Sequence, residues 1–179
     1  MTPASRRAYV GVASNDVPLA SIAAGLVALR RQFGALECSK TVESTALNGH
    51  GPGYLNLVVQ FSTVLNWSQL RAQLKSIEHA CGRRRGDAAA TAVKLDLDLL
   101  ILSGPTGSPD ESDLPLAELC VASYVLAPLA ELLPHWRHPE NSIALAELRA
   151  TTRSNAHQLK CVPDAPWNAT RPDVQVNVA

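Results

Sequence analysis

The stretch Lys94-Leu95-Asp96-Leu97-Asp98 alternates leucines with aspartates. Successive side chains of a β-strand point to opposite faces, so Asp96 and Asp98 share one face while the leucines anchor the other. Two carboxylates spaced in this way lie roughly 7 Å apart, which suits a pair of divalent cations about 4 Å apart that bridge phosphate oxygens. The pattern predicts a Mg²⁺ site, and a solvated acidic face on an edge strand is the alternative.

A basic cluster, Arg83-Arg84-Arg85, lies about a dozen residues before these aspartates. Arginines bind phosphates through paired hydrogen bonds, so a cluster beside the same strand end indicates a site for a metal and a triphosphate. The alternative is a helix C-terminus, where basic residues complement the helix dipole. Lys94 offers one further positive charge on the face of the aspartates, where a salt bridge is its simpler role.

The composition fits one folded domain, because the chain has 179 residues of which 46% are apolar and 18% charged. Sixteen Lys and Arg balance sixteen Asp and Glu, so no net field attracts the chain to nucleic acid or to a membrane surface. The four cysteines lack C-x-x-C spacing, which argues against zinc. With no secretory apolar region and no apolar run of membrane-spanning length, we expect a soluble cytoplasmic protein.

Apolar periodicity and turn residues indicate the elements that must position these groups. We expect strands over residues 8–13, 35–44, 54–62 and 93–102, and helices over residues 19–33, 66–82, 123–133 and 142–149, the second with a capping box at Asn66. The order βαββαβ followed by helices predicts an α+β, ferredoxin-like antiparallel sheet with helices packed on one face. Residues 8–150 would form this domain. Residues 151–179 lack periodicity and predict a C-terminal surface extension, partly disordered.

Five segments of the chain, in order, resemble motifs of the 6-hydroxymethyl-7,8-dihydropterin pyrophosphokinase family. They are the Gly-x-x-Ser-Asn run at residues 11–15, Gly53-Tyr54-Leu55-Asn56, Glu78 with Gly82-Arg83-Arg84-Arg85, the aspartate strand at residues 94–100, and the Val-Leu-x-Pro-Leu-x-Glu block at residues 125–131. The similarity runs from about residue 8 to residue 134. The chain is identified as a divergent member of that family.

The resemblance implies transfer of pyrophosphate from ATP, the co-substrate, to the hydroxymethyl group of a pterin, a step of folate biosynthesis. It implies two Mg²⁺ ions held by Asp96 and Asp98. The partners implied are ATP and the pterin, without nucleic acid or membrane, on a monomer or weak dimer.

The resemblance also assigns roles to individual side chains. Asn56 would hydrogen-bond the pterin edge, and Tyr54 and Tyr124 would stack on its two faces, since a flat polar heterocycle is well held between two aromatic rings. Arg83 and Arg85 would meet phosphates. For the tyrosines, ordinary half-buried packing is the alternative.

The chain departs from the family pattern where phosphates would be held. Residues 89–94 read Ala-Ala-Thr-Ala-Val-Lys in place of the family's Arg-Trp-Gly-Pro-Arg-Thr, and residues 115–118 with Ala122 replace its Pro-His-Pro-Arg block and a later arginine. Loss of an arginine clamp costs about 10³-fold or more in the rate of phosphoryl transfer.

The sequence is therefore consistent with two functions. One is a pyrophosphokinase that still transfers pyrophosphate, weakened or on an altered substrate. The other is a catalytically degenerate relative that binds pterin, nucleotide or a partner protein without turnover. Of the basic residues, Arg83, Arg84, Arg85 and Lys94 are the candidates for a remaining phosphate clamp.

Overall fold

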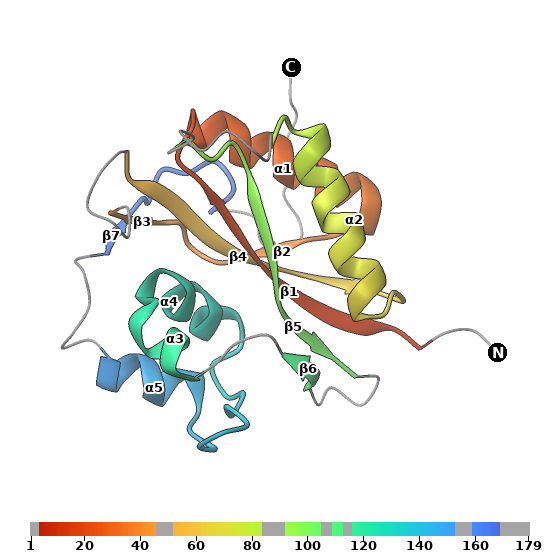
Figure 1. Cartoon of the computed structure of the whole chain (residues 1–179). Helices are drawn as coiled ribbons and strands as arrows, with labels where there is room; N and C mark the ends of the chain where they lie inside the picture. Colours follow the sequence, from red (N-terminus) through yellow and green to blue (C-terminus); the bar gives the residue numbers. More distant parts are fainter. Residues whose placement is uncertain are drawn as a thin grey trace.

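A seven-stranded antiparallel sheet separates two groups of helices (Figure 1). The computed structural model of the chain describes residues 4–45, 52–83, 92–104, 109–112, 116–152 and 159–168. In chain order the elements are β1 (Arg6–Ser14), α1 (Pro18–Phe33), β2 (Glu37–Cys38), β3 (Val42–Ser44), β4 (Tyr54–Thr63), α2 (Trp67–Ala80), β5 (Asp96–Ser103), β6 (Pro109–Ser112), α3 (Leu116–Val121), α4 (Ser123–Leu132), α5 (Leu145–Thr152) and β7 (Lys160–Cys161).

The strand order confirms the α+β class and the ferredoxin-like plan. The order is β6-β5-β1-β4-β3-β7, and β2 also pairs with β4. Its inner part, β5-β1-β4-β3, is the arrangement that a βαββαβ chain makes when β1 and β4 occupy the centre. The expected strand at residues 35–44 is interrupted, because the Ser39 hydroxyl accepts the Val58 N–H at 2.9 Å between the short strands β2 and β3.

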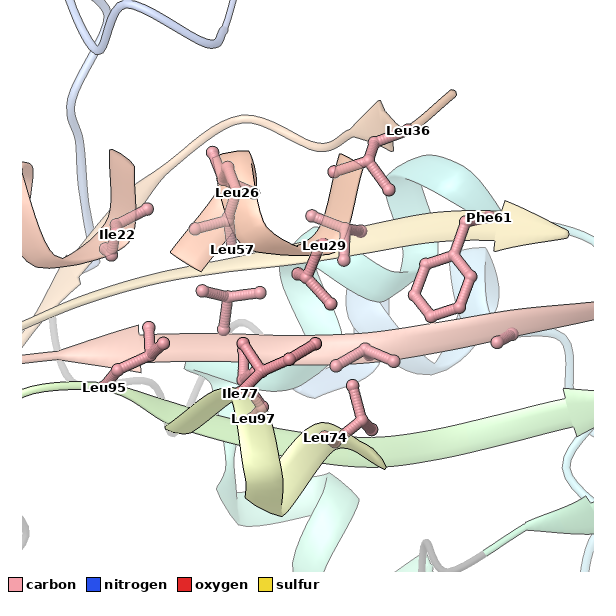
Figure 2. Close-up of a cluster of buried hydrophobic side chains, with 14 of the residues drawn as sticks. Ile22, Leu26, Leu29, Leu36, Leu57, Phe61, Leu74, Ile77, Leu95 and Leu97 are labelled. Carbon is pink, nitrogen blue, oxygen red and sulfur yellow. The ribbon is translucent and has the colours of Figure 1, made fainter. Parts of the chain in front are cut away.

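Helices α1 and α2 cover one face of the sheet and enclose the first core (Figure 2). Leucine and isoleucine side chains of both helices meet β4 and β5 there, and the rings of Phe33 and Phe61 stack with centroids 4.3 Å apart. The predicted capping box begins α2, since Asn66 Oδ1 accepts from Gln69 N at 2.9 Å and Gln69 Oε1 accepts from Asn66 N at 3.0 Å.

Helices α3, α4 and α5, which follow the ferredoxin-like part in the chain, cover the other face of the sheet. Leu126 and Leu129 of α4 pack with Tyr9 of β1 and Val58 of β4 in a second buried cluster. The apolar residues of the predicted third and fourth helices need this second face, because α1 and α2 already fill the first. Within the described residues, no helix is both long and apolar enough to cross a membrane.

The pairing of β5 with β1 shifts by one residue near the middle of β5. Tyr9 pairs with Ile101 and Val10 pairs with Leu99, which leaves Leu100 as an extra residue, a β-bulge. Before the bulge the leucines at 95, 97 and 99 enter the first core, Leu100 and Ile101 enter the second, and Leu102 returns to the first. The bulge therefore places two successive side chains, Leu100 and Ile101, on the same face of the sheet.

Residues 159–168, part of the segment predicted as a C-terminal extension, pack against the edge of the sheet. Lys160–Cys161 forms β7 against β3, and buried Trp167 donates from Nε1 to Thr41 Oγ1 at 2.8 Å. Asn168 Oδ1 accepts from the backbone N–H of Thr41 at 3.1 Å. The sequence did not predict this contact, because a strand of two residues and a single tryptophan show no periodicity. Residues 153–158 and 169–179 lie outside the described residues, and the domain boundary at 150 stays a prediction.

Two cysteines of this sheet should differ sharply in reactivity. Cys38 packs against the first core, and burial raises the pKa of its thiol to about 11, whereas Cys161 is exposed. Because the thiolate is the reactive species, roughly one Cys38 thiol in a thousand is ionised at pH 8. We expect iodoacetamide to label Cys161 first and Cys38 faster as the pH rises toward 11, as followed by peptide mass spectrometry. Equal rates in the native protein would contradict this, and labelling in urea is the control.

Candidate active site

Asn56, Asp96 and Asp98 lie on the sheet face that α4 covers in part. Ala13 of β1 pairs with Asn56 on one side and with Asp96 on the other. Directly paired residues of antiparallel strands point to the same face, so the amide and the carboxylate stand on one face two strand spacings apart, roughly 10 Å. Gly11 pairs with Asp98 and adds no side chain beside it. The predicted common face of Asp96 and Asp98 is confirmed by this register.

Two cations meet the carboxylate pair. Arg83 Nη1 donates to Asp96 Oδ1 and, at 3.2 Å, to the carbonyl of Leu95. Lys75 Nζ lies 3.4 Å from Asp98 Oδ1 and 3.8 Å from Asp96 Oδ1. Arg83 follows α2 directly and Lys75 belongs to α2, so the helix that packs beneath the sheet also brings positive charge to the end of β5.

Glu78 of α2 holds this cluster together from inside the protein. Its side chain is 2% exposed, and Oε1 accepts from the backbone N–H of Leu97 at 2.7 Å. The same oxygen lies 2.6 Å from Lys75 Nζ and 3.2 Å from Arg83 Nη1. A buried carboxylate is stable when charges and hydrogen bonds compensate it in this way. Glu78 therefore sets the positions of both cations relative to β5.

The electrostatics of the pair favour a bound cation. Loss of solvation and the charge of Asp96 raise the pKa of Asp98, and Lys75 opposes the shift. For Arg83, burial lowers the pKa, but the hydrogen bond and charge of Asp96, together with Glu78, raise it above the ordinary value. The Asp98 side chain is 63% exposed, so one carboxylate of the pair remains open to a ligand from solvent.

Tyr124 lies at the start of α4 near the same carboxylates. Burial raises the pKa of its phenol, and the negative charges of Asp98, Glu118 and Asp96 raise it further. Tyr124 and the two aspartates thus belong to one region of the structure.

Asn56 and Tyr54 are held at the other side of that region. The Asn56 side chain is buried, and its Nδ2 donates to Ser44 Oγ at 3.0 Å and to the Tyr54 carbonyl at 3.2 Å. Both amide donors are then used, which leaves Oδ1 as the atom that can accept from a ligand. A Cβ at Gly53 would lie 2.9 Å from the Ser44 carbonyl oxygen, so glycine lets Tyr54 begin β4 against β3.

Lys94 is placed away from the aspartates. Its Nζ lies 3.6 Å from Asp16 Oδ2, in the turn after β1, so it makes the salt bridge that was its simpler role, although with a different partner. The same turn joins the ends of two strands, because Asn15 Nδ2 lies 3.5 Å from the Pro52 carbonyl and Asn15 Oδ1 accepts from Val93 N. Arg85 and Arg84 lie outside the described residues.

Sequence reasoning missed Lys75 among the candidate cations. The signal was weak but present, since Lys75 stands three residues before Glu78 in α2, a spacing that puts both side chains on one face of the helix. Only the packing of α2 along the edge of β5 shows that this face meets the aspartates.

The donor set fits Mg²⁺. Magnesium is held by one or two carboxylates and substrate phosphates and keeps several waters, and Asp96 and Asp98 supply two carboxylates on one open face. In the described part of the chain no three or more His, Cys, Asp or Glu side chains form a metal cluster. The two carboxylates therefore suit an ion that substrate phosphates also hold.

A model of the family 7,8-dihydro-6-hydroxymethylpterin-pyrophosphokinase (HPPK) matches residues 9–134, which include every candidate site residue. The chain belongs to the HPPK family. A protein of Synechocystis sp. named 2-amino-4-hydroxy-6-hydroxymethyldihydropteridine pyrophosphokinase is 28% identical over 144 residues, which cover 79% of this chain and 73% of that protein. Membership places the chain in a family of transferases of folate biosynthesis that move pyrophosphate and that, as a family, use ATP and Mg²⁺.

Proposed function

We propose that this chain transfers the terminal pyrophosphate of ATP to the hydroxymethyl group of 6-hydroxymethyl-7,8-dihydropterin, with two Mg²⁺ ions at Asp96 and Asp98. The observation that carries the proposal is the register of β4, β1 and β5, which puts Asn56 and both aspartates on one sheet face beside Tyr124. A site with an amide that can bind the edge of a heterocycle at one end and carboxylates that can bind metal at the other fits a reaction that joins a heterocycle to phosphates.

The proposed reaction forms a bond between the hydroxymethyl oxygen and the β-phosphorus and breaks the bond between the α- and β-phosphates, so AMP leaves. Bound Mg²⁺ would neutralise charge on the phosphates. Asn56 Oδ1 would accept hydrogen bonds from the pterin edge, and Tyr54 and Tyr124 would flank its faces. Arg83 would contact the phosphates. Arg85, which lies outside the described residues, is proposed as a second arginine that contacts them. Lys94, paired with Asp16, is a weaker candidate for this role.

The deciding experiment measures AMP. Purified protein is incubated with ATP, Mg²⁺ and hydroxymethyldihydropterin, and AMP is followed by liquid chromatography with and without the pterin. Pterin-dependent AMP supports the proposal. No AMP above background at micromolar enzyme would exclude turnover on this substrate.

A second function, binding without turnover, is favoured by the pairing of the cations. Arg83 and Lys75 both contact carboxylates, and the family's other arginines are absent from residues 89–94 and 122. Under this alternative, pterin binding measured by fluorescence would be saturable while the AMP assay stays at background.

The amide of Asn56 should be specific to the pterin rather than to ATP. We expect Asn56→Ala to weaken pterin binding by about tenfold or more, because one ligand-facing acceptor is lost. ATP affinity should stay within twofold. Fluorescence titration of the pterin and calorimetry with a non-hydrolysable ATP analogue measure the two effects. An equal loss for both ligands would show that the substitution disturbs the sheet instead of the pterin contact.

A further inference from the structure

Lys75 is anchored at the carboxylate pair instead of extending freely into solvent. Its ammonium lies 3.0 Å from the Leu97 carbonyl and 2.6 Å from Glu78 Oε1, in addition to its contacts with Asp96 and Asp98. Four oxygens of one strand and one helix therefore surround a single positive charge. Isolated surface ion pairs contribute little, but here a backbone hydrogen bond and a buried carboxylate fix the ammonium.

The edge of β5 explains why the lysine is held there. Strand β6 pairs with β5 only from Ile101 to Ser103, and among the described residues no strand pairs with the same edge at Leu97. Lys75 Nζ donates to the Leu97 carbonyl, and Glu78 Oε1 accepts from the Leu97 N–H. Two side chains of α2 therefore satisfy the backbone groups that a neighbouring strand would otherwise pair.

The lysine changes the charge that a metal ion meets. Glu78, Asp96 and Asp98 carry three negative charges, and Lys75 and Arg83 carry two positive ones, so the cluster has a net charge of about −1. Replacing Lys75 by a neutral residue would make it about −2. A unit charge repels a divalent ion about 5 Å away by an amount equivalent to about tenfold in affinity, even in a water-like dielectric.

We infer that Lys75 acts as a built-in cation of the Asp96 and Asp98 pair, which competes with divalent metal ions and sets how much metal the site requires. The inference rests on the proposed metal role of the two aspartates. It assigns to α2 a function in the site beyond packing, because the ammonium must yield its place near Asp98 when metal binds there. A variant without this charge is a tighter metal binder.

Binding of Mn²⁺ to the full chain without nucleotide or pterin tests the inference, with free Mn²⁺ measured by electron paramagnetic resonance. We expect Lys75→Gln and Lys75→Met to bind Mn²⁺ about tenfold more tightly than the unmodified protein. Lys75→Arg retains the charge and should bind as the unmodified protein does. Lys160→Gln removes the same charge from an exposed position on β7 at the opposite edge of the sheet and should also have no effect.

The outcomes separate this inference from the proposed function. Equal Mn²⁺ affinity of the unmodified protein and both neutral Lys75 variants would overturn the inference alone. A gain in Lys160→Gln as large as in Lys75→Gln would overturn it too, since net charge would then be the cause. No Mn²⁺ binding in any variant would overturn the metal assignment of the aspartates and the inference with it. Circular dichroism and thermal unfolding establish that each variant is folded.

Discussion

Asp96→Asn is expected to reduce pterin-dependent AMP formation by about 10³-fold, the equivalent of about 4 kcal/mol in the barrier. The substitution preserves the shape of the side chain but removes the negative charge that would hold metal against the phosphates. Arg83 keeps Glu78 and the Leu95 carbonyl as partners, so the end of β5 should stay in place. The Mg²⁺-dependent part of ATP affinity should be lost together with activity, as measured by calorimetry in the presence and absence of Mg²⁺.

Asp164→Asn is the matched control for that experiment. Asp164 is an exposed carboxylate in the segment after β7, at the far edge of the sheet. Its loss should leave both AMP formation and ATP affinity unchanged. Unaltered Mg²⁺-dependent ATP affinity in Asp96→Asn would mean that the metal assignment of Asp96 is wrong.

Glu78→Ala is expected to lower the free energy of unfolding by about 3 kcal/mol or more, because it leaves a buried backbone N–H and two cations without their common partner. In a chain of this size that corresponds to a fall in Tm of ~6–12 °C. Urea and thermal denaturation measure the loss. Glu78→Gln should lose less, since an oxygen remains to accept from Leu97 N–H.

Glu147→Ala supplies the control for stability. Glu147 is an exposed carboxylate of α5, and its removal should change the free energy of unfolding by no more than about 0.5 kcal/mol. If Glu78→Ala unfolds at the same denaturant concentration as Glu147→Ala, the network around Glu78 Oε1 does not stabilise the fold.

Local periodicity was enough to predict the central helices and the βαββαβ order of the elements along the chain. The stripe at Ile22, Leu26 and Leu29 predicts a helix over residues 19–33, and α1 spans Pro18–Phe33. The alternation at residues 94–98 predicts the shared face of the aspartates, which the pairing of β5 with β1 confirms. These features depend on neighbours in sequence, so a single chain carries the information.

The missed features depend on contacts between distant segments. The pairing of β7 with β3 and the hydrogen bond from Trp167 to Thr41 join residues more than a hundred positions apart. Lys75 reaches the aspartates only because α2 lies along the edge of β5 at Leu97, where no described strand pairs with it. Lys94 turns to Asp16 because the turn after β1 folds back beside Val93. No spacing rule within one element contains these arrangements.

The bulge at Leu100 shifts the alternation of faces between the two ends of β5. The spacing of Asp96 and Asp98 is set before the extra residue by their pairing with Ala13 and Gly11, whereas Ile101 lies after it and packs in the second core. Ile101 therefore reaches the face of the carboxylates, although it stands three residues after Asp98, a spacing that would put it on the opposite face of a regular strand.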